Sequence, residues 1–128
     1  MRTFARITIA AIVVGTAIAH LKAEEPETVV ITLHAKSGAA SELARVIAKH
    51  WETARSLNLV KDSGHLTMRG TEEGDQTFFM EVFTWRDASI PDAAPKEIQA
   101  IWADMNRLVE KRGGRPSLTI DRVSIVAR

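Results

Sequence analysis

The feature that most constrains the fold is the segment TFFMEVFTW, residues 77–85, in which most positions are bulky and apolar. Successive side chains of a β-strand point to opposite faces of the sheet. Phe78 and Met80 would therefore lie on one face, and Phe79 and Phe83 on the other. Because both faces are apolar, the segment predicts a central strand in a sheet that is covered on both sides.

The hydrophobic period changes along the chain in a way that predicts four strands and two helices. Alternating or β-branched segments indicate strands, and apolar residues spaced by three and four indicate amphipathic helices. The order is strand, helix, strand, strand, helix, strand, which predicts an α+β, ferredoxin-like βαββαβ fold with a four-stranded antiparallel sheet and both helices on one face. The expected strands are residues 28–35, 65–70, 77–85 and 118–127, and the expected helices are residues 39–57 and a segment from Pro95 to the glycines at 113 and 114, with Lys111 and Arg112 in its last turn.

Two helices on one face leave the other sheet face without a cover. A bare apolar face of this size is rarely tolerated in water. The loops are too short to fold over it, so we expect a second copy of the sheet to pack against it in a symmetric homodimer. The alternative is a monomer with a loop over the sheet.

The first 23 residues have the pattern of a secretory signal peptide. Residues 1–6 carry two arginines and no acidic residue, and residues 7–19 carry no charge and end in an A-x-A pattern at Ala19. Thirteen apolar residues are short of the ~20 that a membrane-spanning helix needs. We therefore expect cleavage after Ala19 or Ala23 and a periplasmic or secreted protein, with a retained anchor as the alternative.

Removal of the signal peptide leaves one folded domain, residues 24–128. It takes away three of the 17 basic residues and none of the 16 acidic ones, so the net charge becomes −2. A nucleic-acid-binding protein would need a clustered basic patch, so we expect no nucleic-acid partner. We also expect no stable membrane insertion after cleavage.

Several kinds of chemistry are excluded by composition and motifs. The chain has no cysteine and no tyrosine, which excludes disulfides, thiolate metal sites and a cysteine nucleophile. It has no H-E-x-x-H motif and no acidic calcium-binding loop, so we expect no metal. It also lacks the G-x-S-x-G motif and any phosphate-binding loop.

The chain resembles the dimeric α+β barrel superfamily and, within it, the antibiotic-biosynthesis-monooxygenase-like (ABM) domains. The resemblance rests on a first strand running into Lys36-Ser37-Gly38 and a helix, and on the segment FMEVFTWRD, residues 79–87. It extends over residues 28–127. The family includes monooxygenases, isomerases, haem-degrading enzymes and proteins of no known activity, so the resemblance implies a fold more than a function.

The chain departs from the family pattern at two places. Family members often carry a glutamate two residues before the tryptophan, where this chain has Phe83, and its acidic residue is Glu81. Haem-degrading members use a histidine of the second helix as iron ligand, and this chain has no histidine between Trp85 and Arg112. We therefore expect no cofactor.

His34 and Glu81 are the candidate catalytic residues. A histidine changes charge near neutral pH and can act as a general base. A carboxylate in an apolar strand is costly to bury without a partner, so Glu81 could face a pocket as a base. The alternatives are structural: His34 bonded to backbone at the strand end, and Glu81 in an ion pair with Arg69 or Arg122.

Trp85, Trp102, Met105 and Phe83 are the candidate substrate-binding residues. Aromatic side chains between helices and sheet would hold an aromatic ligand by stacking. The alternative is that they only fill the core. Two functions follow: an exported ABM-like protein that binds a small apolar or aromatic molecule and oxidises it without a cofactor, or a non-catalytic dimeric structural or binding module.

Overall fold

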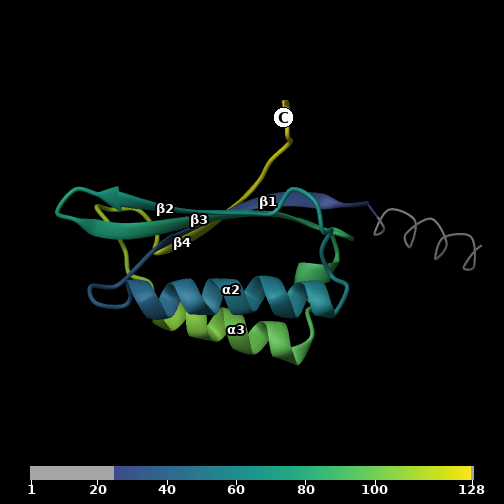
Figure 1. Cartoon of the computed structure of the whole chain (residues 1–128), viewed down its shortest axis with the longest axis horizontal. Helices are drawn as coiled ribbons and strands as arrows, with labels where there is room; N and C mark the ends of the chain where they lie inside the picture. Colours follow the sequence, from purple (N-terminus) through teal and green to yellow (C-terminus); the bar gives the residue numbers. More distant parts are fainter. Residues whose placement is uncertain (1–24, 128) are drawn as a thin grey trace, which may run out of the picture.

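Our computed structural model describes residues 25–127. These residues form a four-stranded antiparallel sheet with two helices on one face (Figure 1). The strand order is β2-β3-β1-β4. This confirms the α+β, ferredoxin-like βαββαβ fold. The elements are β1 (Glu27–His34), α2 (Ala40–Ser56), β2 (Leu66–Glu72), β3 (Gln76–Trp85), a short 3₁₀ helix η1 (Ile90–Ala93), α3 (Lys96–Arg107) and β4 (Leu118–Arg122).

The predicted signal peptide lies outside the described residues and stays a prediction. Within residues 25–127, no helix has the length and apolar character needed to cross a membrane.

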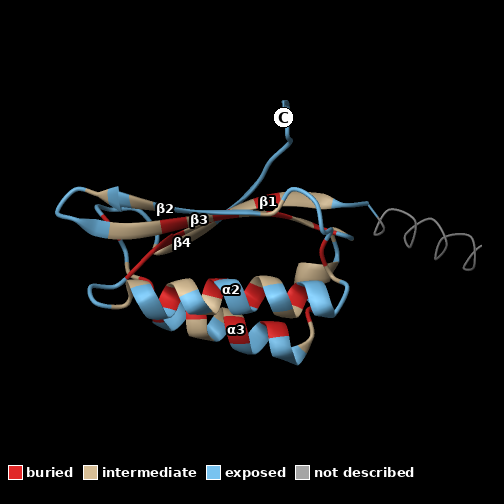
Figure 2. Cartoon of the chain, in the orientation of Figure 1, coloured by how far each residue is buried: buried red, intermediate tan, exposed pale blue. Residues whose placement is uncertain are grey.

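The core lies between the sheet and the two helices (Figure 2). Every second residue of β1 and β3 faces the helices, and these positions are buried. Burying apolar side chains on this face is the main source of stability for such a layer. The larger core residues are Val29, Ile31 and Leu33 of β1, Leu43 and Ile47 of α2, Phe79, Phe83 and Trp85 of β3, and Ile98, Ile101 and Met105 of α3.

The opposite sheet face, here called the outer face, is apolar, and no helix of residues 25–127 lies over it. Met68 of β2 pairs with Met80 of β3, and Gly70 pairs with Phe78. Leu66 and Met68 are 52% and 41% exposed. A side chain at Gly70 would place its Cβ 2.3 Å from the Phe78 ring, so the ring would have to move to make room for it. The outer face is the surface for which we predicted a second copy as cover.

The β2–β3 hairpin is longer than expected. We placed the end of its first strand at Gly70, but β2 continues to Glu72, which pairs with Gln76. The turn is reduced to three residues, of which Gly74 and Asp75 have φ values of 78° and 56°. Glycine adopts this left-handed region without strain, and aspartate tolerates it better than most residues.

Helix α3 ends at Arg107, so the expectation that Lys111 and Arg112 lie in its last turn was wrong. Beyond Arg107 the chain pairs with the end of β1: the Glu110 amide donates to the His34 carbonyl at 2.9 Å. The free backbone carbonyl at the end of β1 gives Glu110 a hydrogen-bond partner outside the helix. The hydrophobic period of the sequence does not show such a partner.

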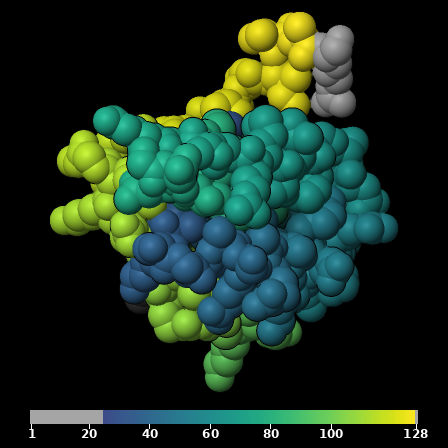
Figure 3. All heavy atoms as spheres, turned by 60° about the vertical axis from the view of Figure 1, so that its left-hand side comes forward, coloured from purple at the N-terminus to yellow at the C-terminus, as the bar shows by residue number. Residues whose placement is uncertain are grey.

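Strand β4 ends at Arg122, whereas we expected a strand to residue 127. Its partner β1 begins at Glu27, and Val29 is the residue paired with Arg122. One further bond follows, from the Val123 amide to the Thr28 carbonyl at 3.0 Å. After Val123 the chain turns away from β1, and residues 124–127 project from the body of the molecule (Figures 1 and 3).

Candidate functional site

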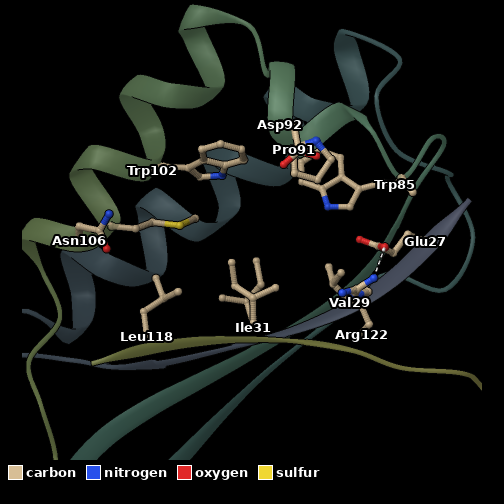
Figure 4. Close-up of a pocket in the computed structure, with 13 residues that line it drawn as sticks. Glu27, Val29, Ile31, Trp85, Pro91, Asp92, Trp102, Asn106, Leu118 and Arg122 are labelled. Carbon is tan, nitrogen blue, oxygen red and sulfur yellow. Dashed lines mark ion pairs between the residues drawn. The ribbon is translucent and has the colours of Figure 1, made fainter. Parts of the chain in front are cut away.

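A pocket of about 530 Å³ lies between the helix-facing side of β1 and β4 and the elements η1 and α3 (Figure 4). Helices α2 and α3 pack against each other, and the edge strand β4 is left partly uncovered. Ile120 shows this, since it points to the helix side and is still 62% exposed. The pocket is lined by Glu27, Val29, Ile31, Trp85, Ala88, Pro91, Asp92, Trp102, Met105, Asn106, Leu118, Ile120 and Arg122.

Two tryptophans form one wall of the pocket. The rings of Trp85 and Trp102 meet edge to face, with centroids 6.3 Å apart and an interplanar angle of 87°. Such a pair is favoured by the quadrupoles of the rings. Met105 extends the same wall, and Val29 and Ile31 of β1 form the floor. The interior of the pocket is therefore apolar and suited to a flat hydrophobic molecule.

Polar side chains lie around the rim. Arg122 and Glu27 form an ion pair at 3.8 Å next to Trp85 (Figure 4). Asp92 of η1 and Asn106 of α3 line other parts of the pocket. These groups can orient a ligand that carries a polar substituent. Arg122 is largely exposed, so its ion pair with Glu27 adds little stability.

Behind the tryptophan wall lies a buried polar network. The indole N–H of Trp102 donates to His50 Nε2 at 3.1 Å. His50 Nδ1 lies 3.2 Å from Glu81 Oε1, and His65 Nε2 lies 3.2 Å from Glu81 Oε2. Because His50 Nε2 accepts a hydrogen bond, the proton of the neutral ring is assigned to Nδ1, which donates to the carboxylate.

Neither arginine that we considered as a partner of Glu81 reaches it, and that expectation was wrong. Arg69 lies over the Phe79 ring, 5.7 Å from its centroid, and Arg122 pairs with Glu27. Glu81 is fully buried on the helix-facing side of β3, where α2 places His50. The buried Glu81 carboxylate therefore accepts hydrogen bonds from the rings of His50 and His65, where we expected a guanidinium group as donor.

His34 belongs to a different cluster. Its Nδ1 donates to Glu72 Oε2 at 2.9 Å, so its side chain bonds a carboxylate and not the backbone group that we considered. Arg112 donates to the same oxygen at 2.6 Å, and Arg115 donates to Glu72 Oε1 at 2.7 Å. Figure 3 shows the segment that follows α3 packed beside the β2–β3 hairpin, where this cluster forms.

These partners favour the ionised form of Glu72. Burial alone raises its pKa, but the hydrogen bond and charge of His34 and the charges of Arg112 and Arg115 outweigh burial. The net pKa of Glu72 is therefore lowered from its usual value. Arg112 also donates to the Ala35 carbonyl at 2.7 Å, which ties the segment after α3 to the end of β1.

The predicted site residues separate into three groups. Trp85, Trp102 and Met105 line the pocket. Phe83 and Glu81 lie in the layer behind the tryptophans and do not line it, and His34 lies in the Glu72 cluster. The roles that we assigned to these residues stay predictions.

Our reasoning from sequence missed the rim residues and the part played by two histidines. His50 occupies an apolar helical stripe and Glu81 an apolar strand, and two polar residues on facing apolar surfaces are a signal that they meet. No such signal marks Glu27, Arg122 or Asn106. Within the described residues, no group of three His, Asp or Glu side chains is arranged to hold a metal ion.

Comparison with solved structures shows that the chain has the fold of the ABM-like proteins. SnoaB from Streptomyces nogalater, described as a cofactor-independent oxygenase, matches with a TM-score of 0.59 and 12% identity over 81% of this chain and 96% of that one. A protein from Caulobacter crescentus, described as a candidate antibiotic biosynthesis monooxygenase, matches with a TM-score of 0.55 and 14% identity over 84% of this chain and 96% of that one.

A conserved protein of unknown function from Bacteroides thetaiotaomicron, described as a possible oxidoreductase, has a TM-score of 0.60 at 11% identity, over 79% of this chain and 98% of that one. No protein-family model matches the chain. No curated protein matches it either.

Proposed function

We propose that this protein binds a small, flat, largely apolar molecule in the pocket beside Trp85 and Trp102. The observation that carries the proposal is the wall itself: two indole rings and Met105 facing a floor of aliphatic side chains around about 530 Å³. That volume falls in the range of about 300–1,000 Å³ typical of small-molecule sites. The polar rim would orient a hydroxyl or carbonyl group of the ligand.

The test uses the three tryptophans of the chain as reporters. Protein labelled with ¹⁵N is titrated with 1-naphthol while the indole N–H signals are followed by NMR. Trp85 and Trp102 line the pocket, whereas Trp51 lies outside it, stacked on His65 with ring centroids 3.7 Å apart. Binding in the pocket shifts the first two signals much more than the third. Equal shifts of all three, or none, would contradict the proposal.

A second candidate function is oxidation of the bound molecule by O₂ without a cofactor. It is favoured by the similarity to SnoaB, described as a cofactor-independent oxygenase. Such chemistry needs a base that reaches the substrate. Glu27 and Asp92 line the pocket, whereas Glu81 and His34 do not. Oxygen uptake with 1-naphthol that is lost in Glu27→Gln but not in His34→Gln would support this function, and no uptake would leave the binding function alone.

We further propose a homodimer formed through the outer face. Its support is the apolar surface of Leu66, Met68, Phe78 and Met80, which neither helix of the described part of the chain covers. A second copy would bring the same surface and cover it symmetrically. We also propose that residues 1–23 direct the protein to the periplasm or the medium, on the composition of that segment alone.

A further inference from the structure

We propose that His50 and Glu81 are positioning residues of the pocket: they fix the indole of Trp102 and thereby the shape of the wall that a ligand meets. Neither residue lines the pocket, so they would act only through Trp102. This inference rests on the proposed function in that the wall is taken to contact the ligand.

A hydrogen bond to His50 fixes the orientation of the Trp102 side chain. Its ring lines the pocket, but its indole N–H donates to His50 Nε2, and His50 does not line the pocket. The N–H bond therefore holds the ring in one orientation and leaves an apolar surface toward the ligand. Without that acceptor, a partly buried indole N–H would turn to find another partner.

Glu81 keeps His50 Nε2 in the form that accepts a hydrogen bond. Glu81 Oε1 accepts a hydrogen bond from His50 Nδ1–H, and this leaves the Nε2 lone pair to accept from Trp102. His50 and Glu81 are 1% and 0% exposed, so water cannot replace either partner. The carboxylate thus selects the ring tautomer that Trp102 requires.

Two aromatic rings of β3 pack against the imidazole of His50. Phe83 lies edge-on to its ring at 5.5 Å between centroids, and Trp85 lies edge-on at 6.3 Å. The same imidazole thus contacts both pocket tryptophans. A change in the orientation of His50 would be transmitted to both members of the wall.

The chain contains a matched control pair. His34 and Glu72 are also a histidine and a glutamate, joined through Nδ1, but neither lines the pocket. Substitutions there test whether loss of any histidine–glutamate pair changes the pocket, or only loss of the pair behind Trp102.

The decisive measurement on the unmodified protein is the tautomer of His50 by ¹⁵N NMR of the imidazole rings. We expect a proton on Nδ1, a lone pair on Nε2, and slow hydrogen exchange of the Trp102 indole N–H. A neutral His50 ring with its proton on Nε2 would overturn the proposal, and this result depends on no ligand and no variant.

The variants compare Glu81→Gln with Glu81→Leu. The glutamine oxygen can still accept from His50 Nδ1, and partly exposed His65 can change tautomer to accept from its amide, so E81Q should leave the Trp102 signal in place. In E81L the signal moves, the indole proton exchanges about tenfold faster, and 1-naphthol binds about tenfold more weakly. Glu72→Leu should leave all three readouts unchanged.

The failures of the two proposals are distinguishable. If 1-naphthol does not bind the unmodified protein, the proposed function fails, while the tautomer and indole exchange still decide the positioning role. If E81L does not fold, the comparison of His50→Gln with His50→Leu replaces it, since glutamine can accept from Trp102 and donate to Glu81. Equal binding and equal Trp102 signals in the paired variants would overturn the proposal.

Discussion

Trp102 of α3 and His50 of α2 are joined by a hydrogen bond of 3.1 Å that ties the two helices together directly behind the pocket wall. His50 Nε2 is buried and has this indole as its donor. The bond therefore contributes to the stability of the helix pair as well as to the shape of the pocket.

Replacement of Trp102 by phenylalanine should destabilise the protein more than the same replacement at Trp51. W102F leaves the His50 acceptor buried and unpaired, at a cost of about 1–3 kcal/mol beyond the loss of apolar area. Trp51 stacks on His65, and W51F makes the same chemical change away from the hydrogen bond of Trp102 to His50, so it is the control. Urea unfolding gives both free energies, and equal values would show that the bond adds nothing.

Glu72 should make the stability of the protein depend on pH in the acid range. Its pKa is lowered in the folded state. Its stabilising contribution is therefore fully present above the ordinary glutamate pKa and is lost as the pH falls through the lowered folded value. Thermal unfolding as a function of pH should show that Glu72→Gln is less stable at neutral pH and that the difference disappears on acidification. A pH-independent difference would contradict this linkage.

A charge placed on the outer face should dissociate the proposed homodimer. Met80 lies in the middle of that face, paired with Met68 and Thr32. Met80→Glu would bury a carboxylate between two apolar sheets, which several kcal/mol of desolvation oppose. Ala100→Glu adds the same charge to an exposed position of α3 and serves as control. Sedimentation velocity should give a dimer for the unmodified protein and A100E, and a monomer for M80E.

The export prediction is tested by the mass of the mature protein. Expression of the full chain in a bacterial host should yield a periplasmic or secreted form that begins at His20 or Glu24. Replacement of the two arginines at positions 2 and 6 by glutamate should retain the chain in the cytoplasm unprocessed. A full-length mass in the exported fraction would favour the retained anchor.

The order of elements was predictable because the hydrophobic period switches clearly between two and 3.6 along this chain. The end of α3 was not, because it depends on the backbone groups at the end of β1, and the local pattern does not show where β4 separates from β1. The residues that follow Arg107 suit a helix, but the Glu110 amide donates a hydrogen bond to the His34 carbonyl, and the helix does not continue. Such competition between local and distant partners leaves no trace in the local pattern.

The site was predictable to the extent that bulky aromatic residues mark a space between layers. Trp85 and Trp102 lie on facing surfaces of a strand and a helix, and a cleft between them could be expected. The contact of His50 with Glu81 could be inferred from two polar residues on facing apolar surfaces, whereas nothing in the local pattern connects His65 with Glu81, 16 residues further along the chain. His50 and His65 contact Glu81 in place of the arginines that we expected. Helix α2 and the residue before β2 place the two histidines on the helix-facing side of β3.

The edge strand β4 has a consequence for how binding can be detected. Its five residues pair with one neighbour only, and three of them, Leu118, Ile120 and Arg122, form part of the pocket. A short strand bonded on one side opens more readily than the central strands β1 and β3. A molecule held against β4 would suppress this opening, so deuterium uptake in the last strand would fall even though its backbone amides never touch the ligand.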